Sequence, residues 1–117
     1  MKDNISVDKS FEFAVRVVNL YKYLTQTKKE YILSKQLLRC GTSIGANISE
    51  AQMGQSKADF TAKMSIALKE ASETEYWLKL LFRTDYLTEK EYDSIHAEID
   101  EITSILVSIC KTSKDSK

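Results

Sequence analysis

Metal binding and nucleophilic catalysis are the chemistries that the reactive side chains of this chain could perform. The single histidine, His96, follows Asp93 at a spacing of three residues, which resembles half of the Glu-x-x-His pairs that hold two metal ions in helical bundles. Such a site needs carboxylates on four helices and two histidines, so half of the ligand set is missing. Cys40 and Cys110 occupy apolar helical positions, which predicts buried reduced thiols. We therefore expect no enzymatic activity, no metal and no cofactor.

A file of polar side chains runs through a segment that otherwise has the composition of a buried helix. Its members stand four, four and three residues apart and would share one helical face: Arg39, Ser43, Asn47 and Glu50. Beside it runs an apolar file made of Leu37, Cys40, Ile44, Ile48 and Ala51. The combination is typical of a helix that is buried on more than one side, and it indicates packing between subunits more than catalysis.

Two glycines lie in the same segment. Gly41 and Gly45 fall inside the predicted helix and do not follow a strand, so they do not form a phosphate-binding loop. Each glycine costs about 1 kcal/mol relative to alanine in a helix interior. Close packing against a neighbouring helix is the compensation that we expect.

Charged residues at positions expected to be buried need partners. Arg39 interrupts a buried face of the second helix, and Glu75 interrupts the apolar file of the third. Because unpaired buried charges are costly, we expect the two to pair with each other or with a neighbouring subunit. Ser43 and Asn47 would satisfy remaining donors or fix the helix register. The alternative is that Arg39 and Glu50 only make exposed contacts within their own helix.

The elements that position these residues are predicted to be four helices in one domain spanning residues 1–117. The chain has 117 residues, no proline and three glycines, and its 43% hydrophobic content is that of a globular protein. Periodicity places the helices at about 8–25, 28–53, 56–84 and 88–111, followed by a flexible tail over 112–117. Because the connections are short, we expect an all-α, up-down-up-down antiparallel four-helix bundle.

Capping signals support these helix starts. The first helix could be capped by Asp8 or Ser10. The later starts carry capping-box pairs, namely Thr27 with Glu30, Ser56 with Asp59, and Thr88 with Glu91. Gly54 is expected to end the second helix in the left-handed conformation.

Two apolar patterns describe how the helices should pack. The fourth helix has a strict heptad seam formed by Tyr92, Ile95, Ile99, Ile102, Leu106 and Ile109. The first helix has two stripes, one formed by Phe13, Val17, Leu20 and Leu24, and the other by Phe11, Val15, Val18 and Tyr21. One stripe can face the bundle, so the second needs another partner.

The hydropathy pattern excludes the usual membrane and secretion signals. No apolar run approaches the roughly 18 residues needed to cross a bilayer, and no hydrophobic stretch of signal-peptide type follows the N-terminus. We expect a cytoplasmic protein that does not bind membranes.

Charge is distributed unevenly along a chain whose net charge is zero. Residues 1–69 carry 11 Lys and Arg against 6 Asp and Glu, whereas residues 70–117 carry 6 against 11. One explanation is that solvated helix faces carry arbitrary charge, since the chain has no dense basic block. The other is a basic surface that, repeated by symmetry, could bind a polyanion. The candidate nucleic-acid-binding residues are Arg16, Lys22, Lys28, Lys29, Lys35 and Lys57. Nearby lie Tyr21, Tyr23 and Tyr31, although tyrosines at helical spacing more often pack than stack on bases.

The segment from Leu37 to Leu81 resembles a known family. Its second-helix pattern Arg-x-x-x-Ser-Ile-x-x-Asn-Ile-x-Glu, from Arg39 to Glu50, is similar to that of the bacterial four-helix-bundle family of 23S ribosomal RNA intervening-sequence proteins. Further matching positions are Ser56, Phe60, Ser65, Ile66, Ala67, Glu73, Glu75 and Leu78. The likeness covers about residues 10–110. The chain departs from many members at Gly45, where they have proline, and at Ala51, where they have glycine.

The resemblance implies an oligomer and two kinds of partner. It implies a homopentamer of bundles that binds RNA or DNA without a settled activity. A related branch is the accessory protein of diversity-generating retroelements, which partners a reverse transcriptase. Our leading hypothesis is a non-catalytic oligomer that binds nucleic acid through basic residues. The alternative is a protein-binding scaffold that uses the exposed apolar files of the first helix and Trp77.

Overall fold

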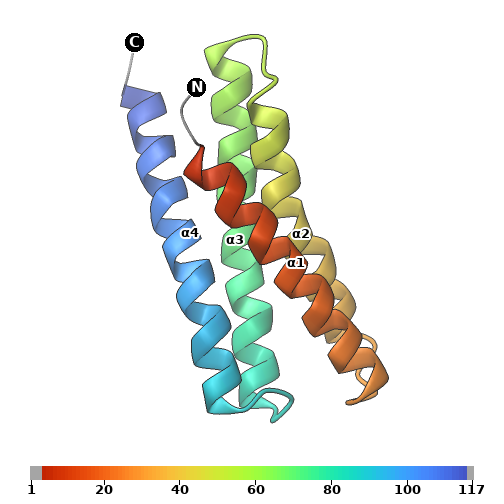
Figure 1. The fold of residues 1–117 in the computed structure, drawn as a ribbon. Coiled ribbons are helices and arrows are strands. Elements are labelled where there is room, and N and C mark those ends of the chain that lie inside the picture. The colour runs from red at the N-terminus through yellow and green to blue at the C-terminus, as the bar shows by residue number, and fades with distance from the viewer. Residues whose placement is uncertain (1–3, 116–117) are drawn as a thin grey trace.

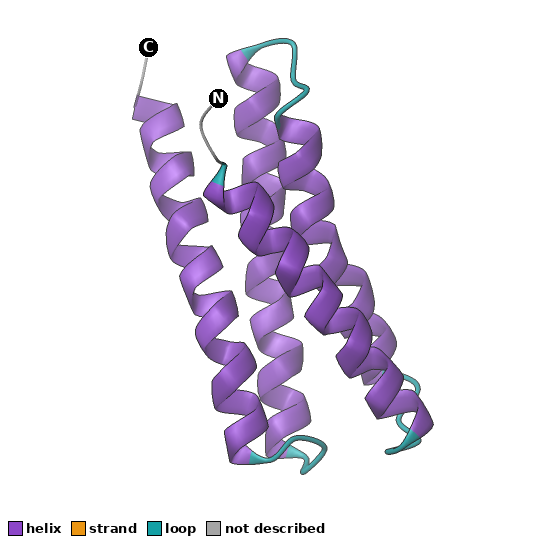
Figure 2. Cartoon of the chain, viewed as in Figure 1, coloured by secondary structure: helices purple, strands orange, loops and turns teal. Residues whose placement is uncertain are grey.

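Four antiparallel helices make up the part of the chain that the computed structural model describes, residues 4–115 (Figures 1 and 2). They are α1 (Ile5–Gln26), α2 (Leu33–Ala51), α3 (Lys57–Arg83) and α4 (Glu89–Asp115). The predicted all-α bundle is confirmed. Because successive helices reverse direction, the α1–α2 and α3–α4 connections lie at one end of the bundle and the α2–α3 connection lies at the other (Figure 1).

The first helix begins earlier than the sequence predicts. The side-chain oxygen of Asn4 accepts a hydrogen bond from the Val7 backbone N–H at 3.3 Å, which is the geometry of an N-cap. Asp8 and Ser10, the predicted caps, therefore lie inside α1. Ser10 is buried, and its hydroxyl donates to the Val7 carbonyl at 3.1 Å.

The start of α2 corrects the predicted capping box at Thr27 and Glu30. Thr27 is the C-cap of α1, and its N–H donates to the Tyr23 carbonyl at 2.9 Å. Glu30 precedes α2, and its carboxylate accepts the first free N–H groups of that helix, from Ile32 at 3.1 Å, Leu33 at 2.9 Å and Ser34 at 2.7 Å. The second helix therefore starts at Leu33 and not near residue 28.

The end of α2 also differs from its prediction. No glycine among residues 4–115 has a positive φ, so Gly54 does not close the helix in the left-handed conformation. The Gly54 N–H instead donates to the Ala51 carbonyl at 3.1 Å in a right-handed turn. Left-handed backbone occurs at Lys29 (φ 58°) and Asp85 (φ 70°), in the two connections at the opposite end of the bundle.

The remaining caps agree with the sequence. The Ser56 hydroxyl accepts the Asp59 N–H at 3.1 Å at the start of α3. At the start of α4 the Thr88 N–H donates to the Glu91 carboxylate at 2.8 Å, and the Glu91 N–H donates to the Thr88 hydroxyl at 3.1 Å.

The end of α4 corrects the prediction of a flexible tail over 112–117. The helix continues to Asp115, so most of that segment is helical. Residues 116–117 lie outside the described part of the chain.

The core follows the predicted apolar files except at one position of α3. The α4 seam is buried from Ile95 to Leu106. In the α1 stripe Phe13, Val17 and Leu24 are fully buried and Leu20 is half-buried. On α3 the buried position is Thr74, whose hydroxyl donates to the Glu70 carbonyl at 2.8 Å. A shift of one residue turns a helical side chain by about 100°, so Glu75 does not interrupt the core as predicted.

The two helix-interior glycines lie where α1 and α2 pack closely. A Cβ atom on Gly41 would lie 2.9 Å from both terminal methyl carbons of Val17, which is buried. One on Gly45 would lie 3.2 Å from the Ser10 carbonyl oxygen. The expected compensation for glycine is thus an intrachain contact between α1 and α2.

None of the four helices is both long enough and apolar enough for a membrane span over the described residues.

Candidate nucleic-acid interface

The polar file of α2 lies at the surface and not in the core. The Arg39 side chain is 53% exposed and contacts two carboxylates of α3, Glu73 and, at 3.5 Å, Glu70. The Trp77 indole N–H donates to the same Glu73 carboxylate at 3.1 Å. Arg39 therefore has partners, as predicted, but they are neither Glu75 nor buried.

The other members of the file bond locally. The Asn47 amide donates to the Ser43 carbonyl at 2.9 Å and contacts its hydroxyl at 3.0 Å, within α2. Exposed Glu50 pairs with Lys63 of α3 at 2.8 Å. Some of these contacts join α2 to α3 and others stay within α2. The prediction that the polar file is buried is therefore wrong for the single chain, and so is the alternative that Arg39 and Glu50 contact only their own helix. A role of this file in subunit contacts stays a prediction.

Glu75 pairs with the histidine. Its carboxylate lies 2.8 Å from His96 Nε2, and the two side chains are 48% and 32% exposed. The His96 ring stacks on Tyr92, with centroids 5.2 Å apart, and Tyr92 stacks on Phe82 at 4.5 Å. Glu75 thus connects α3 to α4 through a surface contact. Such contacts contribute little to stability.

The residues considered for catalysis and metal binding form no metal site among the described residues. Cys40 and Cys110 are buried free thiols, and burial is the largest influence that raises the pKa of the Cys40 thiol. Within residues 4–115 no three His, Cys, Asp or Glu side chains are grouped so that they could hold a metal ion.

Four of the six basic candidates lie together, and the other two lie elsewhere. Arg16 pairs with Glu98 of α4 and donates to the Ser94 hydroxyl at 2.7 Å, so its charge is compensated. Lys57 is the first residue of α3, at the end of the bundle that holds the α2–α3 connection. The other four lie at or beside the α1–α2 connection, and we call this group with its loop the basic corner: Lys22, Lys28, Lys29 and Lys35.

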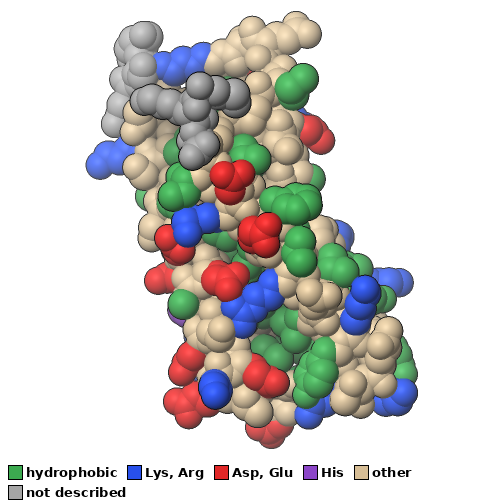
Figure 3. All heavy atoms as spheres, in the orientation of Figure 1, with side chains coloured by type: hydrophobic (Ala, Val, Ile, Leu, Met, Phe, Trp, Pro, Cys, Tyr) green, Lys and Arg blue, Asp and Glu red, His purple; other side chains and the backbone are tan. Residues whose placement is uncertain are grey.

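The lysines of the basic corner are exposed and carry no ion pair with any described residue. Lys28 Nζ lies 5.9 Å from the centroid of the Tyr23 ring, a cation–π distance. The only acidic residue between Lys22 and Lys35 is Glu30, whose carboxylate is occupied by backbone N–H groups. In Figure 3 blue side chains gather at the lower right, over the lower ends of α1 and α2, whereas red ones gather on the α4 side.

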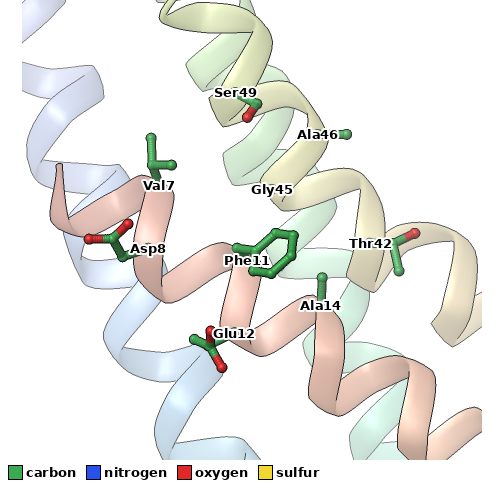
Figure 4. Close-up of a pocket in the computed structure, with 9 residues that line it drawn as sticks. All are labelled: Val7, Asp8, Phe11, Glu12, Ala14, Thr42, Gly45, Ala46 and Ser49. Carbon is green, nitrogen blue, oxygen red and sulfur yellow. The ribbon is translucent and has the colours of Figure 1, made fainter.

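A second surface feature is a groove of about 650 Å³ between α1 and α2. Figure 4 shows Phe11 projecting over it toward α2, while Asp8 and Glu12 point away from α2. Phe11 is 65% exposed and Val15, of the same stripe, is 43% exposed. The predicted second apolar stripe of the first helix is therefore uncovered at these positions in the single chain.

Tyr31 is the residue of this region that the sequence analysis assessed wrongly. It was grouped with tyrosines at helical spacing, but it lies in the connection before α2 and is 58% exposed, whereas Tyr21 and Tyr23 are half-buried. The displaced start of α2 is the reason, because Tyr31 would have been helical if α2 began near residue 28.

Two comparisons with known proteins found matches, and the two agree with each other. A family model described as 23S rRNA-intervening sequence protein matches residues 2–108. A crystal structure of a protein with unknown function from the S23 ribosomal protein family of Bacteroides thetaiotaomicron VPI-5482 is 60% identical to this chain, with a TM-score of 0.89. The match covers 91% of this chain and 98% of that one. No curated protein matches the chain.

Proposed function

This chain belongs to the family of 23S rRNA-intervening sequence proteins, and from that premise we propose that it is a non-catalytic, homo-oligomeric protein that binds nucleic acid through the basic corner. A cytoplasmic location is part of the same proposal. The observation that carries it is the grouping of four exposed lysines around one connection. None of the four pairs with a carboxylate of the described residues, and the one acidic residue between Lys22 and Lys35, Glu30, has its carboxylate occupied by backbone N–H groups.

Uncompensated lysines at one end of a protein favour a polyanionic ligand. Phosphate contacts release counterions, so binding of this kind is strongly salt-dependent. The chain as a whole has no net charge, so its net charge does not attract polyanions. The local concentration of lysines is what supports binding at this corner.

The oligomeric part of the proposal is supported by the exposed stripe of α1. Large exposed apolar side chains are typical of a protein interface, and Phe11 and Val15 are both exposed. Phe11 also borders a groove that a neighbouring subunit could fill. A homopentamer is the assembly that we propose. The second candidate function is a scaffold that binds a protein partner, such as a reverse transcriptase, through the same stripe.

The test is a binding titration with labelled RNA and DNA at about 50 mM and about 200 mM salt. We expect binding that weakens steeply with salt, and a variant with Lys28→Gln and Lys35→Gln that binds more weakly and has a shallower salt slope, by about 0.7 per lost contact on single strands. The matched control is Lys79→Gln with Lys90→Gln, which removes the same charge from the exposed surface of the acidic half.

Absence of binding at low salt would reject the nucleic-acid function and favour the scaffold. An equal loss in the control variant would show that the basic corner is not the binding surface.

A further inference from the structure

The basic corner presents an aromatic ring and a large aliphatic side chain to solvent. Tyr31 is 58% exposed and Ile32 is 75% exposed, and both lie between Lys29 and Lys35 in the sequence. Soluble proteins often expose single apolar residues, but here the two are adjacent and are flanked in the sequence by lysines of the basic corner. An aromatic face beside uncompensated cations is the arrangement with which proteins bind unpaired nucleotides.

The backbone that presents Tyr31 is fixed by hydrogen bonds. The Glu30 N–H donates to the Leu24 carbonyl at 2.9 Å, and the Ser34 hydroxyl donates to the Glu30 carbonyl at 2.8 Å. Glu30 itself is only 7% exposed. Its carboxylate accepts hydrogen bonds from the backbone N–H groups of Ile32, Leu33 and Ser34, which follow Tyr31 in the chain. Tyr31 is thus held between two anchored residues, and a ligand that contacts it has little loop ordering to impose.

We propose that the basic corner binds single-stranded nucleic acid, with an unpaired base stacked on Tyr31 and the flanking phosphates placed against the lysines of the corner. The inference rests on the proposed function and narrows its ligand. A base inside a duplex is already stacked on its neighbours, so its face is not available to Tyr31, whereas a base in a single strand is. The ring has no sequence preference to impose, because every base has a π-face.

The experiment measures binding of labelled 15-nucleotide oligo(U) and oligo(dT), and of duplexes of the same length, to the full chain. We expect both single strands to bind more tightly than the duplexes. The Tyr31→Ala variant should bind the single strands roughly 5- to 150-fold more weakly, the range that corresponds to ~1–3 kcal/mol for one stacked base. Its salt slope should equal that of the wild type, because no charge is removed.

Two variants control for the loss of an exposed aromatic. Tyr31→Phe keeps the ring and should bind as the wild type does. Tyr76→Ala removes a tyrosine of matched exposure, 59%, from α3 and should leave binding unchanged. The mass of each variant in solution should be that of the wild type, since Tyr31 is not required for assembly in this proposal.

The outcomes separate this inference from the proposed function. If Lys28→Gln with Lys35→Gln weakens binding but Tyr31→Ala does not, stacking is overturned and the basic corner remains a phosphate-binding surface. If duplexes bind as tightly as single strands, the inference is also overturned. A change of oligomer mass in Tyr31→Ala would reassign the ring to a subunit contact, and an absence of any binding by the wild type would reject both proposals.

Discussion

Glu30 shows how a single side chain determines the structure of the basic corner. A capping carboxylate usually accepts one or two N–H groups, and Glu30 accepts three while buried. Burial raises the pKa of Glu30, but the hydrogen bonds from Leu33, Ser34 and Ile32 together outweigh it, so that the pKa lies below the ordinary value of 4.5. The charged form is therefore favoured in the folded protein.

We predict that Glu30→Gln lowers the melting temperature at neutral pH, by a loss of about 1–2 kcal/mol in the free energy of unfolding. Because the folded pKa is depressed, the stabilisation by the charge is complete above the unfolded value and is lost as the pH falls through the folded value, below 4.5. Thermal denaturation of both proteins from about pH 7 to about pH 3 should show the difference narrowing at the acidic end. A difference that stays constant over this range would show that the charge does not contribute.

At the scale of elements, α1 has a different relation to each of its neighbours. It packs closely on α2 through the glycine positions, whereas its contacts with α4 include the ion pairs Lys9–Glu101, at 3.2 Å, and Arg16–Glu98. Two grooves lie between α1 and α4, one lined mainly by charged side chains and one lined by Arg16 together with polar and apolar side chains. The stability of the α1–α2 pair thus depends on steric fit, and we expect it to respond strongly to added volume.

We predict that Gly41→Ala destabilises the bundle despite the better helix propensity of alanine. The added Cβ would lie 2.9 Å from the methyl carbons of Val17, a stiff β-branched side chain with no exposure, and overpacking of this kind costs about 1–3 kcal/mol. The control is the double variant Gly41→Ala with Val17→Ala, in which the new methyl group enters the space that Val17 vacates. Chemical denaturation should show that the double variant loses less free energy of unfolding than the two single variants lose together. Losses that simply add would refute the steric explanation.

At the scale of the whole molecule, the single bundle leaves two surfaces without partners, the stripe of α1 and the basic corner. The exposed part of the stripe, Phe11 and Val15, lies toward the start of α1, whereas the basic corner lies at the end of α1. Subunits joined through the stripe would therefore keep their corners free. Repetition of the corner by symmetry would give several linked sites for one strand, which raises the apparent affinity.

The prediction at this scale compares two phenylalanines that stand two residues apart in α1 and lie on different faces of the helix. Phe13→Ala should cost about 3–5 kcal/mol of folding stability, since Phe13 has no exposure. Phe11→Ala, at 65% exposure, should change the stability of the dissociated chain by less than about 0.5 kcal/mol but should reduce the oligomer mass in sedimentation experiments. An unchanged mass for Phe11→Ala would exclude the stripe as the subunit interface.

The sequence by itself predicted the four helices and most of the core, because apolar periodicity and most of the capping pairs are local properties. It indicated the family through the resemblance of the pattern from Arg39 to Glu50. The α4 seam and the capping box of Thr88 and Glu91 could be predicted for this reason. Tertiary structure decided which residues meet across helices. Arg39 pairs with Glu73 and not with Glu75, because the two-residue step between them turns the side chain by about 200° around α3, toward α4 and His96. It also decided the basic corner, since only the folded chain gives Glu30 its three donors, moves the start of α2 and leaves Tyr31 in solvent.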